Sequence, residues 1–263
     1  MGIVETISCS NCGAPLPIKA GEVIITCEYC GTATNIASGE VFFLKHSIIP
    51  SNVADTEIEK IVRKWMGDGP LKPSNLASRS KITGTSLVFL PFYIIHADAV
   101  TNYEGFFTRT GRKERREGAL RREYFWKIIG RRGSKFPTKE YEIPLSGKEN
   151  FNISKIPGYA RFLNAELDEA DAKDIARSEI EEHQEFLIKE QVNELIHTEH
   201  DITVEDVEYI HAPIWKVDYR YNKRDYQILL DSSSKDVIRG DIPPPDQSVS
   251  GFLSDIKKAF FGR

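Results

Sequence analysis

The placement of the cysteines constrains the fold more than any other feature of this sequence. All four lie within the first 30 of the 263 residues, as two Cys-x-x-Cys pairs that are each followed by glycine. Two residues between cysteines let one tight turn direct both sulfurs toward a single ion, and the glycine relieves backbone crowding beside those sulfurs. The pattern predicts one structural zinc ion held by the thiolates of Cys9, Cys12, Cys27 and Cys30.

Four other chemistries use similar cysteine patterns. Two disulfides suit a secreted protein, and the sequence shows no secretory signal. A thioredoxin-like redox motif needs one Cys-x-x-Cys beside a βαβ unit, whereas two matched pairs are present here. Catalytic zinc keeps one coordination position open, and four cysteines fill them all. An iron site of the rubredoxin type uses the same kind of pairs and stays open as the alternative to zinc.

The composition is typical of a globular protein. Hydrophobic residues make up 40% of the chain and charged residues 28%, with a net charge of −4. No apolar run approaches the roughly 18 residues of a membrane-spanning helix. Together with the missing secretory signal, this predicts a cytoplasmic protein, with the inner face of the membrane as a peripheral location.

Local patterns divide the chain into three parts and predict an α+β fold. Residues 1–40 form the zinc ribbon, residues 41–242 a mainly antiparallel β body with one long acidic helix, and residues 243–263 a proline-broken linker with an amphipathic helix. Runs of β-branched and aromatic residues indicate strands, and apolar residues at helical spacing indicate helices. The expected strands cover 41–44, 87–95, 102–107, 124–129 and 140–143, and the expected helices cover 56–66 and 166–198.

The body contains a weak internal repeat. Residues 213–219 echo residues 91–97, and each segment begins with proline and is followed by a tyrosine that opens another strand. This predicts two similar hairpin units, arranged as one pseudo-symmetric sheet or as two sheets around a core. The alternative is that hairpins with a leading proline look alike by chance.

The charges are segregated along the chain. Residues 109–135, the basic block, carry a net charge of +8, and residues 166–208, the acidic stretch, carry −13. Arginines on loops suit phosphate contacts, so the block is a candidate site for nucleic acid or anionic lipid. It also suits an acidic protein, or neutralisation by the acidic stretch within the fold or across a homodimer. Its basic residues are Arg109, Arg112, Lys113, Arg115, Arg116, Arg121, Arg122, Lys127, Arg131, Arg132 and Lys135. We expect Gly111 to Gly118 to form a hairpin loop within it.

The last sixteen residues have the pattern of an amphipathic helix after a triple-proline break. Phe252, Leu253, Ile256, Phe260 and Phe261 are its candidate residues for binding a membrane or a partner's groove. The alternative is that this segment folds back onto its own body, because exposed aromatic helices are a liability.

No catalytic motif is present. The chain lacks G-x-S-x-G, a phosphate-binding loop, G-x-G-x-x-G and H-E-x-x-H. The cysteines are assigned to the metal, and the histidines have no nucleophile beside them in sequence. The sequence therefore predicts a protein that is not an enzyme and implies no small-molecule substrate.

Short motifs along the body carry a resemblance to a known family. In order, they are Ile61-x-x-Lys64-Trp65, Leu90-Pro91-Phe92-Tyr93, Phe125-Trp126-x-x-x-Gly130, Ile143-Pro144-Leu145 and Ala212-Pro213-Ile214-Trp215. With the two cysteine pairs, they resemble the prokaryotic proteins known as TFIIB-type zinc-ribbon-containing proteins. The resemblance implies a zinc ribbon on an α+β body without established enzymatic activity. Some family members carry transmembrane helices and are linked to envelope stress; this chain departs from them by having no such helix.

These features together predict a non-enzymatic zinc-ribbon adaptor that engages a protein partner or a membrane surface. The alternative is a protein that binds RNA, the ribosome or DNA through the basic block. Self-association into a homo-oligomer is compatible with both.

Overall fold

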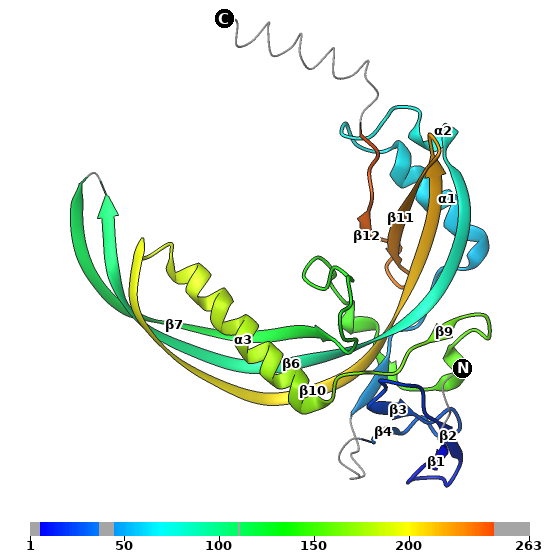
Figure 1. Cartoon of the computed structure of the whole chain (residues 1–263), viewed down its shortest axis with the longest axis horizontal. Coiled ribbons are helices and arrows are strands. Elements are labelled where there is room, and N and C mark those ends of the chain that lie inside the picture. The colour runs from blue at the N-terminus through cyan, green and yellow to red at the C-terminus, as the bar shows by residue number, and fades with distance from the viewer. Residues whose placement is uncertain (1–5, 37–44, 110, 245–263) are drawn as a thin grey trace, which may run out of the picture.

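Three long antiparallel strands dominate the computed structural model, which describes residues 6–36, 45–109 and 111–244. They are β6 (Lys81–Arg109), β7 (Arg112–Ile129) and β10 (Glu194–Tyr221), with β6 in the middle. Figure 1 shows them sweeping outward together as a curved arm. At about 3.3 Å per residue, the 29 residues of β6 span roughly 95 Å of strand. The fold is α+β, as expected, with a mostly antiparallel sheet.

Shorter strands complete the sheet at the base of the arm. β11 (Arg224–Asp231) pairs with β10 through a tight turn at Asn222 and Lys223, both of which have positive φ, and β12 (Val237–Gly240) pairs with β11. Thus β6 with β7 and β10 with β11 form two hairpins in one sheet. β5 (His46–Ile48) runs parallel to β10, β8 (Glu149–Asn150) pairs with β5, and β9 (Arg161–Phe162) pairs with β6.

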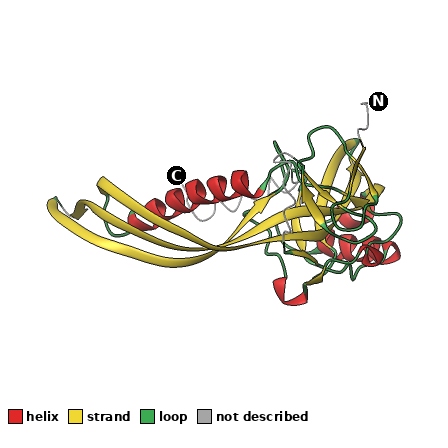
Figure 2. Cartoon of the chain, turned by 90° about the horizontal axis from the view of Figure 1, so that it is seen from below, coloured by secondary structure: helices red, strands yellow, loops and turns green. Residues whose placement is uncertain are grey.

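The helices cover different parts of the sheet. α1 (Asp55–Gly67), with the short α2 (Leu76–Arg79), packs at the base, where Ile58, Val62 and Met66 meet Trp215 in the largest apolar cluster. α3 (Glu169–Ile188) lies along one face of the arm, as Figure 2 shows from the side. Its small residues Ala172 and Ala176 are fully buried, which lets the helix backbone approach the strands closely.

The N-terminal segment with the four cysteines, the ribbon, consists of two small hairpins beside the base. The first pairs β1 (Thr6–Ser8) with β2 (Pro15–Pro17), and the second pairs β3 (Ile24–Thr26) with β4 (Ala33–Asn35). Figure 1 shows both at the same end of the molecule as β9, far from the tip of the arm.

Three expectations about elements were wrong, for related reasons. The expected helix over 166–198 ends at Ile188, because residues 194–198 pair with β6 as the start of β10. The expected loop at 111–118 is strand from Arg112 onward, because every residue there has a partner on β6. The expected strand at 140–143 is turn and coil, although Tyr141 and Ile143 are buried against the sheet.

Two expected elements lie outside the described residues. One is the strand at 41–44, next to β5. The other is the C-terminal amphipathic helix with Phe252, Leu253, Ile256, Phe260 and Phe261.

Candidate functional site

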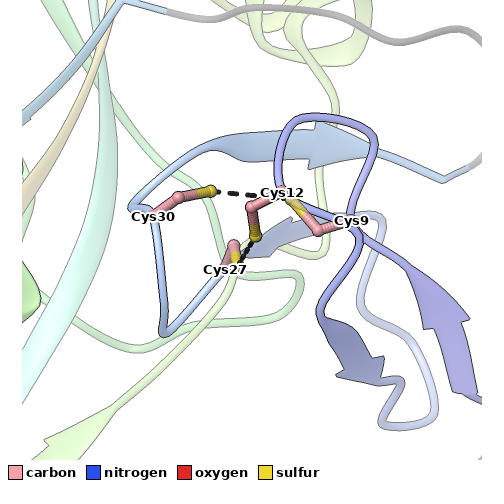
Figure 3. Close-up of side chains that lie close together, drawn as sticks. All are labelled: Cys9, Cys12, Cys27 and Cys30. Atoms are coloured by element: carbon pink, nitrogen blue, oxygen red, sulfur yellow. Dashed lines mark hydrogen bonds between the residues drawn. The ribbon is translucent and has the colours of Figure 1, made fainter.

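The four cysteine sulfurs lie together as a four-ligand metal site. The Cys9 and Cys30 sulfurs are 3.6 Å apart, as are those of Cys12 and Cys27, and all four atoms lie within 4.8 Å of one another. Figure 3 shows the side chains pointing inward from the two knuckle turns. A tetrahedral ion with metal–sulfur bonds of about 2.3 Å needs sulfurs about 3.8 Å apart. The residues therefore fit one metal ion, as the sequence predicted.

Each knuckle is a turn closed by backbone hydrogen bonds. The N–H of Gly13 donates to the carbonyl of Cys9 at 2.8 Å, and the N–H of Gly31 donates to that of Cys27 at 2.9 Å. Both glycines adopt positive φ, 74° and 77°, which residues with a side chain rarely accept. The glycine after each Cys-x-x-Cys pair is thus required by the turn that directs the sulfurs.

Without metal, the thiols of Cys27 and Cys30 have pKa values shifted in opposite directions. Burial raises the pKa of Cys27 to about 12. Burial also acts to raise the pKa of Cys30, but hydrogen bonds from Thr32 and Asn11 outweigh it and lower that pKa to about 6. A bound metal ion would displace the protons of these thiols, since a coordinating thiol is deprotonated outright. Binding of a metal ion by these thiols would therefore be coupled to proton release.

The ribbon is docked tightly on the body. Ile24 is fully buried in a cluster with Tyr93, Ile95 and Ala165. The N–H groups of Val23 and Ile24 both point to the carbonyl of Ala165, at 2.9 and 3.2 Å. The hairpin of the second knuckle thus contributes to the core of the body. A metal ion at this knuckle would stabilise the contacts between the ribbon and the body as well as the turn itself.

A pair of histidines links the second knuckle to the sheet. His46 Nδ1 lies 3.2 Å from the carbonyl oxygen of Gly31, His46 Nε2 lies 2.9 Å from His211 Nδ1, and His211 Nε2 lies 3.0 Å from the carbonyl oxygen of Leu163. His46 stacks on Phe151 with ring centroids 4.0 Å apart. Two neutral rings carry two N–H groups between them, so only two of these three contacts are hydrogen bonds at once. Burial lowers the pKa of His46 to about 4 and that of His211 well below its usual value.

Replacing Gly31 with alanine should destabilise the protein more than replacing Gly13. Both positions have positive φ, so both variants are strained. Only at Gly31 would the new Cβ lie 2.8 Å from the ring of Phe151, which is already stacked on His46. We expect urea unfolding to show about 1–3 kcal/mol of extra loss for Gly31→Ala over Gly13→Ala. Equal losses of unfolding free energy in the two variants would mean that the contact between the second knuckle and Phe151 does not stabilise the protein.

The basic block runs from Arg109 at the end of β6 through β7 to the turn after it, and much of it is ion-paired. Lys113–Glu194, Arg131–Glu166 and Arg132–Asp171 join the block to the acidic stretch at 2.5–2.7 Å. Arg115 pairs with Glu104, Arg116 pairs with Glu114, and Lys127 donates to the carbonyl of Tyr141. The two charge blocks thus neutralise each other in part within one chain. Among the described residues, Arg112, Arg121, Arg122 and Lys135 have no such ion pair.

The aromatic residues of the block divide between core and surface. Tyr124 and Trp126 face α3, where the Trp126 indole N–H donates to Glu179 at 2.7 Å. Phe106 and Phe107 lie under Lys113 and Arg116 as cation–π partners. Phe125 keeps 60% of its surface exposed. A continuous platform for stacking bases is therefore not formed by these side chains.

Sequence reasoning missed a groove along the outer edge of β7. It has a volume of about 1170 Å³, and its floor is formed by the eight consecutive residues Arg122 to Ile129. One wall is α3, through Ile175, Glu179 and His183, which recur every four residues on one side of the helix. The other wall is the loop over 131–140, including Phe136. We call this cavity the edge groove.

The edge groove combines apolar side chains with charged side chains of both signs. Trp126, Ile128, Phe136 and Ile175 line it, and Ile175 remains 37% exposed. The pKa of His183 is lowered by burial and then by the charges of Arg122 and Lys139. A concave surface that is mostly apolar with a few charged groups is the kind of site that binds a ligand.

Comparisons with known proteins assign neither a family nor a related structure to the chain. No family model matches the chain, and neither do the curated proteins or the solved structures. The likeness to TFIIB-type zinc-ribbon-containing proteins thus stays a prediction. Among the described residues, no helix is long and apolar enough to cross a membrane.

Proposed function

We propose that this protein is a non-enzymatic zinc-ribbon adaptor that binds a segment of a protein partner in the edge groove. The observation that carries the proposal is the groove itself, about 1170 Å³ of space walled by α3 and the 131–140 loop. The four cysteines hold zinc in this proposal, because four thiolates fill its tetrahedral coordination and leave no position for catalysis. The zinc stabilises the base from which the arm and the groove extend.

A protein segment suits the edge groove better than a polyanion does. Trp126, Phe136 and Ile175 provide apolar surface of the kind that anchors peptide side chains. Two of the arginines beside it, Arg131 and Arg132, already pair with Glu166 and Asp171. Binding of nucleic acid depends on many unpaired basic side chains of the protein that contact the phosphate backbone. Binding of an anionic membrane has a similar requirement. The following experiment distinguishes binding of a protein segment from binding of nucleic acid or of an anionic membrane.

The test uses random 12-residue peptides displayed as a library and selected on the whole protein. Enriched peptides should bind the wild-type protein and lose about tenfold in affinity with Ile175→Gln, which places an amide in the apolar wall. Leu71→Gln is the matched control, because Leu71 is 80% exposed and lies outside the groove. Its affinity should stay unchanged.

Two results would contradict the adaptor proposal. One is that no enriched peptide senses Ile175→Gln. The other is that short RNA or anionic vesicles bind more tightly than any peptide, with an affinity that falls steeply as salt rises.

A further inference from the structure

We infer that the partner segment is an extended strand that pairs with the free edge of β7, and that acidic residues follow where it passes Arg121 and Arg122. This inference rests on the proposed function, because it describes how the partner of the same groove is held. It assigns a binding mode and a chemical class of partner.

The edge groove follows the backbone of β7 rather than one face of the sheet. Side chains alternate between faces along a strand, yet all eight residues from Arg122 to Ile129 line the groove. Ile128 packs on the α3 side, whereas Ile129 packs with Phe136 on the opposite side. The cavity therefore runs along the strand's outer edge, between one wall on each face.

That edge has backbone groups ready to pair. Within the described ranges, β7 pairs with β6 alone, so its outer N–H and C=O groups have no strand beside them. An edge of this length is a template for another strand. Strand addition satisfies the backbone groups, and pockets on both faces then receive alternate side chains of the added strand. The two-walled shape of the edge groove matches this requirement.

A second copy of this chain is a poor occupant. In each copy the edge at 122–129 is recessed between α3 and the 131–140 loop, so two such edges cannot approach each other. Further out, β7 from Arg112 to Arg122 carries six basic residues and two acidic ones. Antiparallel pairing of two such edges would place like charges opposite each other, which is destabilising.

The same charges specify the partner. Arg121 and Arg122 lie at the outer end of the edge groove, and no ion pair joins either of them to an acidic residue in the described part of the chain. An added strand that continues outward from the groove runs beside this unpaired positive charge. Acidic residues there gain attraction, and basic residues are disfavoured. We therefore assign apolar alternation to the portion in the groove and acidic residues to the portion beyond it.

The decisive probe is an enriched 12-residue peptide, resynthesised with single N-methyl groups along its backbone. N-methylation removes one donor and blocks the approach of the neighbouring strand. If the peptide adds to β7, affinity should fall about tenfold or more at every second residue and change little at those between, since only alternate amides face the edge. Losses without this two-residue period overturn strand addition, while binding that still senses Ile175→Gln leaves the adaptor proposal standing.

Charge reversal tests the class of partner. Arg121→Glu with Arg122→Glu should weaken acidic peptides about tenfold or more and should shift library selection toward basic residues. Lys223→Glu with Arg224→Glu is the matched control, because this adjacent basic pair is exposed where the turn after β10 leads into β11. An equal loss in both double variants, or none in either, overturns the acidic assignment.

The chain's own tail is the remaining competitor for the edge groove. The described chain ends at Pro244, shortly after Asp241, which lines a smaller cavity that shares Pro137 with the edge groove. Peptide affinity should be unchanged when residues 245–263 are removed. Peptide binding that appears only after this truncation would assign the groove to the tail and overturn the inference.

Discussion

Replacing Cys27 with serine is expected to abolish metal binding and to unfold the zinc ribbon. Cys27 is fully buried, and it follows β3, whose residue Ile24 packs against the body. A ribbon of about 40 residues buries too little surface to fold by itself, so the free energy of metal binding is largely its free energy of folding. Loss of the ribbon also exposes Ile24 and its partners Tyr93 and Ala165. We expect a lower melting temperature for the whole chain and new protease cleavage within residues 6–36.

The control for this prediction is Ser10→Ala, an exposed change inside the first knuckle that removes no ligand. Elemental analysis should find about one zinc per chain in the wild type and the control, and none in Cys27→Ser. Iron in the wild type would overturn the zinc assignment. A Cys27→Ser variant that keeps the metal and the wild-type melting temperature would show that the four-thiolate site does not support the fold.

Acidification from pH 7 to pH 5 is expected to lower the free energy of unfolding by about 2 kcal/mol through His46 alone. Burial lowers the pKa of His46 to about 4 in the folded protein, against about 6.5 when unfolded. The unfolded chain therefore binds more protons between these values. The stabilisation is fully present above pH 6.5 and is lost as pH falls toward 4. The lowered pKa of His211 adds loss in the same direction.

Urea unfolding at both pH values, in excess zinc, measures this loss. In His46→Phe the histidine term is removed, so the difference between pH 7 and pH 5 should shrink by about 2 kcal/mol. His197→Gln is the control for replacing a histidine, because His197 is exposed on β10. An identical pH dependence in wild type and His46→Phe would refute the buried neutral assignment.

The metal site was predictable because its information is local. Two Cys-x-x-Cys pairs and their glycines specify turns and ligands within a few residues, and the sulfurs lie within 4.8 Å as a result. The class of fold was also predictable, since strand and helix periods are local signals. The finer boundaries were not.

The distal half of β7 shows why. Its sequence, from Arg112 to Gly118, reads Arg-Lys-Glu-Arg-Arg-Glu-Gly and has no apolar alternation, because both faces of the arm tip meet solvent. What makes it a strand is pairing with β6 at every residue, which is invisible in the local pattern. The start of β10 after Ile188 is set in the same way, by partners on β6.

The edge groove depends on topology even more strongly. Its floor, its loop wall and its helix wall come from residues 122–129, 131–140 and 175–183, and only the packing of α3 and the loop on opposite faces brings them together. One signal was present in the sequence: Ile175, Glu179 and His183 are spaced four residues apart along the helix. That spacing indicated a shared side, but not what the side faces.

Hydrogen–deuterium exchange of the whole protein with a selected peptide tests the central claim most directly. If the protein is an adaptor that receives a partner strand in the edge groove, saturating peptide should slow the exchange of amides within residues 122–129. A separate edge strand at the base of the sheet, β12 (Val237–Gly240), should exchange as before. Slowed exchange in the ribbon or at the basic tip of the arm, with none at 122–129, would contradict the account.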